Sequence, residues 1–302
     1  MQSKKQKMAI GSIMVLVSAV AFSSKAILVK LAYAYPVDAA TLIALRMLFS
    51  IPFFAGLIFW VRSQGNYTPL SRKHLAEIIV LGVIGGYGSM WLNFAGLEYV
   101  TAGLERVILF LYPTMVVLIS AAMLGRGISK RELLALVLSY AGVILVVWHD
   151  VDIAHSTKTL LGAGLVFASA LTYAAYLVWS GEIIARIGAP LFTAYMMLFA
   201  SVASAAHFAT TEHIDTMLHL PGEVYWLSFL MAALATVLPS ILMNLGIQHL
   251  GSSKAALLSS VGPVSTIFLA YLFLNEQIGW LQFVGTLLVL TGVLAISLEN
   301  KR

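Results

Sequence analysis

The sequence predicts an all-α membrane protein in which ten transmembrane helices form two inverted five-helix repeats around a central cavity. Three observations support this fold class: an apolar composition, long uninterrupted apolar runs, and a match between the two halves of the chain. Of the 302 residues, 60% are hydrophobic and 10% are charged. Soluble domains are about 45–50% apolar and about 25% charged. The composition therefore excludes a soluble globular protein, and it also excludes a disordered chain, which needs low hydrophobicity.

The apolar runs are continuous rather than alternating, which favours helices over the strands of a membrane barrel. A helix of about twenty apolar residues crosses the hydrocarbon core of a bilayer. The first half of the chain gives five such spans, over residues 9–31, 38–61, 75–98, 101–123 and 130–149. The second half gives five more, over residues 159–184, 190–209, 224–248, 252–274 and 278–298. The connections between them are too short to hold a soluble domain.

The distribution of basic residues predicts the orientation, because Lys and Arg concentrate in cytoplasmic loops. A cytoplasmic N-terminus leaves only Lys30 and Lys158 outside the cell. The basic residues then on the inner side are Lys4, Lys5, Lys7, Arg62, Arg72, Lys73, Arg126, Lys130, Arg131, Arg186, Lys254, Lys301 and Arg302. We therefore expect a multi-pass protein of the cell (inner) membrane with both termini in the cytoplasm.

The two halves of the chain match each other at an offset of about 150 residues. GSIMVLVSAVAF at 11–22 corresponds to GAGLVFASALTY at 162–173. Helix-breaking residues recur at equivalent places, with Gly96 over Gly246, Pro113 over Pro263, and Gly142 over Gly292. The prediction is therefore two repeats, residues 1–150 and 157–302. Because five spans is an odd number, the second repeat enters the membrane from the opposite side, as in many transporters.

Two longer segments carry a family resemblance: YP…LSYAGVILVV at 112–147, and GP…LFLNEQIGWLQFVGTLLVLTGVLAI at 262–296. With the duplication, they make nearly the whole chain resemble the drug/metabolite transporter superfamily, specifically its ten-helix EamA type. The family often has an acidic residue after the fourth and ninth helices; Glu276 fits, whereas the first repeat has Arg126. The resemblance implies a basket of helices 1–4 and 6–9 around a central cavity, with helices 5 and 10 as a buttress. It also implies export of amino acids and other small metabolites.

Four ionisable residues fall well inside the predicted spans, where charge is costly and marks functional candidates: Lys25, Arg46, Glu105 and Arg106. Their counterparts in the second repeat are uncharged: Tyr176, Met196, Ala255 and Ala256. The three basic residues are candidates for binding a carboxylate or phosphate of a substrate, and Glu105 for gating or coupling. Two other readings stay open: a salt-bridge network that locks a gate or joins helices, and side chains that snorkel to the headgroups.

Aromatic residues near the middle of the spans form a second set of candidates for substrate binding: Tyr87, Trp91, Tyr112, Tyr173, Tyr176 and Trp179. Such side chains lining a cavity would hold flat or apolar groups and attract cations, although aromatics also fill packing and lipid-facing positions. Pro113 and Pro263 each remove a backbone hydrogen bond. These matched prolines are candidates for gating hinges, with static kinks as the alternative.

Other function classes lack support in the sequence. It contains no HExxH, GxSxG or phosphate-binding loop, and no cysteine. The basic residues are scattered between apolar runs, so nucleic acid is not an expected partner. We expect no enzyme activity, cofactor or metal, and partners limited to a small-molecule substrate and the lipid bilayer, with the oligomeric state open. The function expected is a secondary transporter that exports small organic metabolites, amino acids foremost, by alternating access. The alternatives are efflux of aromatic or cationic drugs, or a channel.

Overall fold

The computed structural model describes residues 4–64, 70–125, 127–154, 157–211, 214–250, 255, 258–259 and 261–299, and these contain helices and no strand. The helices of the first half are α1 (Lys4–Ala32), α2 (Ala39–Ser63), α3 (Arg72–Val80), η1 (Leu81–Gly88), α4 (Ser89–Leu97), α5 (Ala102–Leu109), α6 (Tyr112–Leu124) and α7 (Lys130–Ala154). Those of the second half are α8 (Thr157–Ile187), α9 (Ala189–Thr211), α10 (Ile214–Leu218), α11 (Gly222–Ala232), η2 (Ala233–Val237), α12 (Leu238–Leu250), α14 (Val261–Leu274) and α15 (Trp280–Glu299).

These helices confirm the predicted class of all-α membrane protein. Among the described residues, eight helical segments are long and apolar enough to cross a membrane, and they match the first eight predicted spans. The ninth and tenth correspond to two shorter apolar helices, Val261–Leu274 and Trp280–Ala295. Part of the predicted ninth span lies outside the described residues, as do Arg126, Lys254, Ala256, Lys301 and Arg302.

Within the described residues, three of the spans are not single regular α-helices. The third combines α3, η1 and α4, and the eighth combines α11, η2 and α12, where η1 and η2 are π-helical turns at equivalent places in the two repeats. The fourth is broken between α5 and α6, because Pro113 has no N–H to donate to Leu109 and stands instead in the first turn of α6. π-Helical turns are frequent at functional sites.

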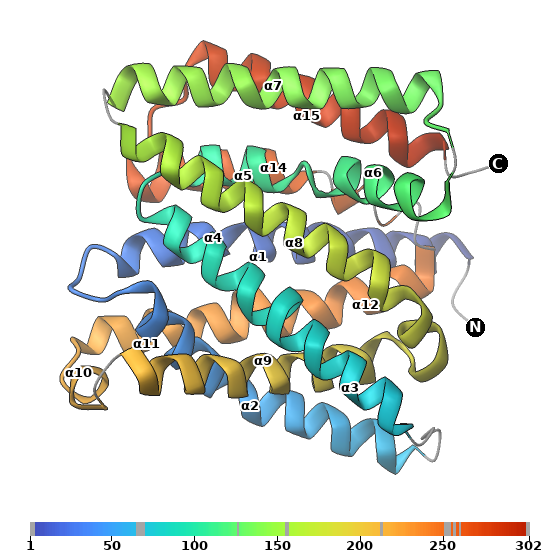
Figure 1. Cartoon of the computed structure of the whole chain (residues 1–302), viewed down its shortest axis with the longest axis vertical. Helices are drawn as coiled ribbons and strands as arrows, with labels where there is room; N and C mark the ends of the chain where they lie inside the picture. Colours follow the sequence, from blue (N-terminus) through green and yellow to red (C-terminus); the bar gives the residue numbers. More distant parts are fainter. Residues whose placement is uncertain are drawn as a thin grey trace.

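The helices pack with approximate two-fold symmetry: contacts between helices recur between the equivalent helices when the two repeats are interchanged. The first helix, α1, packs against α12 and α14, and its counterpart α8 packs in the same way against α4 and α6. The pairs α2 with α9 and α7 with α15 each join equivalent helices of the two repeats. Figure 1 shows these two pairs at opposite ends of the bundle, with α1 beginning and α15 ending on the same side. Because each repeat has five spans, the axis lies in the membrane plane and the repeats are inverted.

The recurring glycines stand at the points where these helices cross. A Cβ added at Gly96 would lie 3.0 Å from the carbonyl oxygen of Gly162, and one added at Gly246 would lie 3.2 Å from that of Gly11. The two contacts are equivalent under exchange of the repeats. Small residues allow helix backbones to approach this closely in membranes. The glycines that revealed the duplication in the sequence therefore form the same helix crossing twice.

The outward surface of the bundle is apolar. Large side chains such as Phe59, Trp148 and Trp280 are more than half exposed, at 76%, 73% and 74%. Apolar surface this extensive is rare on soluble monomers and is expected where a protein faces lipid.

Candidate functional site

A cavity of about 610 Å³ lies at the centre of the bundle. Its described lining residues come from the first four spans of each repeat, whereas α7 and α15 contribute none. This arrangement matches the basket and buttress that the family resemblance implies. The helices α1, α2, α8 and α9, which pack in equivalent ways in the two repeats, therefore also contribute to the cavity wall.

A charged triad, formed by Lys25, Asn93 and Glu105, joins α1, α4 and α5 at the cavity wall. Lys25 Nζ donates hydrogen bonds to Asn93 Oδ1 at 2.7 Å and to Glu105 Oε1 at 3.1 Å. Asn93 Nδ2 donates to the same carboxylate oxygen at 2.8 Å. Glu105 is fully buried, and its second oxygen has no hydrogen-bond partner. Lys25 and Asn93 line the cavity, and Glu105 lies behind them.

Arg46 of α2 is also bound within the protein. Its Nε and Nη2 donate to Thr236 Oγ1 at 3.1 and 2.7 Å, and its guanidinium lies 5.5 Å from the ring centre of Phe94. Thr236 belongs to the π-helical turn η2 and donates its own hydroxyl proton to Met231 O at 2.9 Å. The wide turn therefore presents the hydroxyl oxygen toward the arginine. Sequence reasoning missed Asn93 and Thr236, because a neutral polar residue in an apolar span gives only a weak signal.

Arg106 of α5 has a different environment. It lines the cavity, and its Nε is buried without a hydrogen-bond partner. The guanidinium lies against α14 at Gly262, where an added Cβ would be 2.6 Å from Arg106 Nη2. Glu105, Tyr112 and Tyr173 are its electrostatic neighbours. A glycine at 262 is thus needed for the guanidinium to lie where it does.

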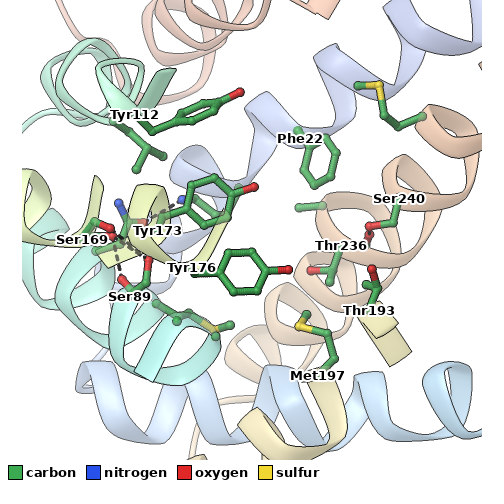
Figure 2. A pocket seen from close by; sticks show the side chains of 18 of the residues that line it. Phe22, Ser89, Tyr112, Ser169, Tyr173, Tyr176, Thr193, Met197, Thr236 and Ser240 are labelled. Carbon is green, nitrogen blue, oxygen red and sulfur yellow. Dashed lines mark hydrogen bonds between the residues drawn. The ribbon is translucent and has the colours of Figure 1, made fainter. Parts of the chain in front are cut away.

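Four aromatic rings form a ladder, and three of them, those of Tyr112, Tyr173 and Tyr176, line the cavity. Tyr112 meets Tyr173 edge-on with ring centres 5.3 Å apart, Tyr173 stacks on Tyr176 at 5.6 Å, and Tyr176 stacks on Phe192 at 6.0 Å. Figure 2 shows the three tyrosine hydroxyls pointing into the open centre of the cavity. The residues labelled across from them in Figure 2 are Phe22, Thr193, Thr236 and Ser240.

A contact between the repeats lies at the other end of α5. Glu276, in the loop before α15, accepts hydrogen bonds from the backbone N–H groups of Ala102 at 2.8 Å and Gly103 at 3.2 Å. Burial is the main influence on this carboxyl group and raises its pKa, although the two N–H groups and Lys30 act in the opposite direction. The acidic residue that fits the family pattern therefore caps the helix that carries Glu105 and Arg106.

Comparison with known proteins identifies the family. The model of the EamA-like transporter family matches residues 9–148 and again residues 160–298. The chain belongs to the EamA-like transporter family. YcbK of Bacillus subtilis, an uncharacterized transporter, is 32% identical over 97% of this chain and 95% of its own length. YicL of Salmonella typhimurium, an uncharacterized inner membrane transporter, is 26% identical over 77% of this chain and 76% of its own length.

A solved structure supports the fold of this EamA-like protein. One crystal structure superposes with a TM-score of 0.63 at 18% identity, over 99% of this chain and 100% of the other. This likeness concerns the fold alone. Together with the family match and the apolar helices, it makes the protein a multi-pass membrane transporter of the EamA-like family.

The structure gathers six of the nine predicted binding residues of this EamA-like transporter around the cavity: Lys25, Arg46, Arg106, Tyr112, Tyr173 and Tyr176. It places three elsewhere. Tyr87 and Trp91 pack against His207 of α9, to which Tyr87 is also hydrogen-bonded, and neither is part of the lining. Trp179 is 56% exposed and lies outside it as well. Pro113 and Pro263 stand in the first turns of α6 and α14, also outside the lining.

The two halves of the cavity are equivalent in fold and different in chemistry. The charged triad has uncharged counterparts that also line the cavity: Tyr176, Met243 and Ala255. The contact of Arg46 with Thr236 likewise has an apolar counterpart, because a Cβ added at Gly86 would lie 2.7 Å from Met196 Sδ. The charged side chains of the described lining therefore all come from the first EamA-like repeat, whereas the described lining residues of the second repeat are uncharged.

Proposed function

We propose that this EamA-like protein is a secondary transporter that moves small organic metabolites out of the cell by alternating access, with amino acids as the first class to test. The central cavity carries the proposal. Its volume of about 610 Å³ lies within the range of small-molecule sites, and eight of the ten spans enclose it.

The lining favours a substrate that carries negative charge. Lys25, Arg46 and Arg106 are the charged side chains among the described lining residues, and the nearest carboxylate, Glu105, is already engaged by Lys25. Cationic side chains stabilise a carboxylate or phosphate by charge-assisted hydrogen bonds. The same lining is unfavourable for cationic drugs. The α-carboxylate of an amino acid matches it.

Inverted repeats supply a route to alternating access, since two related halves can exchange conformations around one site. Opening the cavity toward the predicted outer face has to separate α1 from α4. Two hydrogen bonds now hold this end of α1 to α4, from Lys30 Nζ to Leu97 O at 3.0 Å and from the hydroxyl of Tyr33, the residue after α1, to Phe94 O at 2.9 Å. In this mechanism Pro113 and Pro263, at equivalent places in the two repeats, are the candidate gating hinges, and Glu105 is the candidate coupling residue.

Counterflow in proteoliposomes tests the proposal. The purified protein is reconstituted with a high internal concentration of one unlabelled amino acid, and uptake of the labelled form is followed for a panel of amino acids. Saturable, transient accumulation that needs the internal substrate is the expected result, because an alternating-access carrier exchanges one molecule for another. A voltage-driven current without saturation would show a channel instead. Absence of counterflow for every amino acid would remove this substrate class. Protein-free liposomes are the control.

A further inference from the structure

The three cationic side chains of the cavity, Lys25, Arg46 and Arg106, differ in how many hydrogen bonds they donate to other groups of the protein. Lys25 donates to Asn93 and Glu105, and Arg46 donates twice to Thr236. Arg106 keeps a buried Nε–H without a partner. The structure therefore separates one cation that is available to a ligand from two that are engaged within the described part of the chain.

An unpartnered guanidinium at this depth is unfavourable unless something complements it. Burying a donor without a hydrogen bond costs free energy, and the cost is larger for a charged group inside a membrane protein. Glu105 is the adjacent carboxylate, but its Oε1 already accepts from Lys25 and Asn93, and its unpartnered Oε2 is buried behind the wall. The Arg106 Nε–H is buried as well, but Arg106 lines the cavity, so an anion there would complement the charge of its guanidinium.

We propose that Arg106 binds the carboxylate of the transported substrate and that the tyrosine ladder beside it holds a flat apolar group of the same molecule. The inference rests on the proposed transport function and names its substrate class. Tyr112 and Tyr173, the electrostatic neighbours of Arg106, are the first two rings of the ladder, so the anion site and the aromatic wall are continuous. Gly262 of α14 leaves the room that the guanidinium occupies.

A single monoanionic carboxylate fits better than a phosphate dianion. One arginine has a free donor here, and its cavity-facing neighbours are neutral phenols rather than further free cations. Arginine binds a planar carboxylate through two parallel N–H groups, and low surrounding polarity strengthens that contact. The carboxylate is then the group that is recognised, and the described lining offers no acidic partner for an ammonium group.

Four compounds with one phenylpropanoyl skeleton test this assignment on the full-length protein in nanodiscs: L-phenylalanine, 3-phenylpropionate, and the amide of each. Thermal stabilisation by each compound reports its affinity. We expect both acids to bind, with or without the amino group, and both amides to bind at least tenfold more weakly. Equal binding of acid and amide would overturn the inference. Phenyl phosphate is the fifth probe, and tighter binding of this phosphate than of either acid would also overturn it.

Substitutions at Arg106 add a second test. Arg106→Gln should lower the affinity for the acids at least tenfold, to that of the amides, and Arg106→Lys should give an intermediate affinity because lysine offers no planar fork. Trp179→Leu is the matched control, since this exposed side chain lies outside the cavity, and it should leave the preference for acids unchanged. Acids that still bind more tightly than amides in Arg106→Gln would assign the anion site to another residue. The acid-to-amide comparison is measured by binding and does not depend on transport. Absence of counterflow for every compound would therefore argue against the proposed transport function and not against the assignment of Arg106.

Discussion

At the scale of single residues, stability depends on the buried ion pair between Lys25 and Glu105. Glu105 is fully buried, and the Lys25 ammonium is 3.1 Å from its Oε1. Removing one member of such a pair leaves the other as an uncompensated buried charge, which is more costly than removing both. Lys25 and Glu105 therefore have to be altered together if the fold is to be preserved.

Lys25→Met should lower the free energy of unfolding by about 3 kcal/mol, the low end of the range for breaking a buried pair, because Asn93 still donates to the carboxylate. The double variant Lys25→Met with Glu105→Gln should recover most of that loss. Thermal unfolding of the purified variants in detergent measures both effects. A double variant as unstable as the single one would show that packing of the lysine stem, rather than charge, is responsible.

Glu276 makes stability depend on pH, because burial raises the pKa of its carboxyl group in the folded protein. The folded protein therefore holds the proton of Glu276 more tightly than the unfolded chain does. The contribution of the protonated carboxyl group to the free energy of unfolding is complete below the unfolded pKa, about 4.3, and is lost as the pH rises through the folded pKa. The melting temperature of the native protein relative to Glu276→Gln should therefore fall as the pH is raised from about 4. A difference that stays constant or grows with pH would contradict this assignment.

The sequence indicates some site residues and not others for a physical reason. Lys25, Arg46 and Arg106 are found because charge inside an apolar run is rare and costly. Asn93 and Thr236 are missed because their importance depends on which spans meet. The aromatic candidates are harder to sort, because a helix surrounded by lipid is apolar on all sides and its sequence does not show which side faces the cavity. Tyr173 and Trp179 are thus equivalent in the sequence, whereas only Tyr173 reaches the cavity.

At the scale of helices, close crossings determine how the spans fit together. A Cβ added at Gly162 in α8 would lie 2.9 Å from the carbonyl oxygen of Gly96 and 2.7 Å from Tyr99 Cβ. Gly164, two residues further along the same helix, has nothing within 4 Å of an added Cβ. The two glycines share a helix and differ only in what they face, so they form a matched pair for substitution.

Gly162→Ala should lower the free energy of unfolding by about 1–3 kcal/mol, because the added methyl group meets backbone that cannot move aside cheaply. Gly164→Ala should be neutral or slightly stabilising, since alanine is the better helix former. Thermal unfolding in detergent compares the two. An equal loss of stability in both variants would mean that backbone flexibility of α8, rather than its crossing with α4, requires glycine.

Other features of the helices lie beyond prediction from the sequence. The π-helical turns η1 and η2 occur at equivalent positions, although one is glycine-rich and the other reads ALATV. A local pattern therefore does not specify them. A shared hydrogen bond accompanies them: Ser169 Oγ donates to Ser89 O at 2.7 Å, and Ser18 Oγ donates to Pro239 O at 2.7 Å. The tertiary contact, rather than the local sequence, is what the two repeats have in common.

At the scale of the whole molecule, the fold is far more predictable than the cavity. Apolar composition and the repeated glycines and prolines were sufficient to predict the spans and the inversion, and the family resemblance implied which helices enclose the cavity. These features follow from backbone hydrogen bonding and helix packing, which many sequences satisfy. The contents of the cavity instead depend on residues at which the repeats differ, such as Arg46 against Met196 and Glu105 against Ala255. The two repeats therefore share a backbone frame, and the residues at which they differ give the cavity its charge.

Orientation in the membrane is the remaining property of the whole molecule that the sequence predicts, and the absence of cysteine makes it directly measurable. Gln64 follows α2 on the predicted inner side, and Gln277 lies before α15 on the predicted outer side; both are exposed. Gln277→Cys should react with a membrane-impermeant maleimide in intact cells, whereas Gln64→Cys should react only after permeabilisation. This follows because the excess of Lys and Arg near the ends of the spans retains those segments in the cytoplasm. The reverse labelling pattern would place both termini outside, and equal labelling of both sites in intact cells would mean that the chain inserts in both orientations.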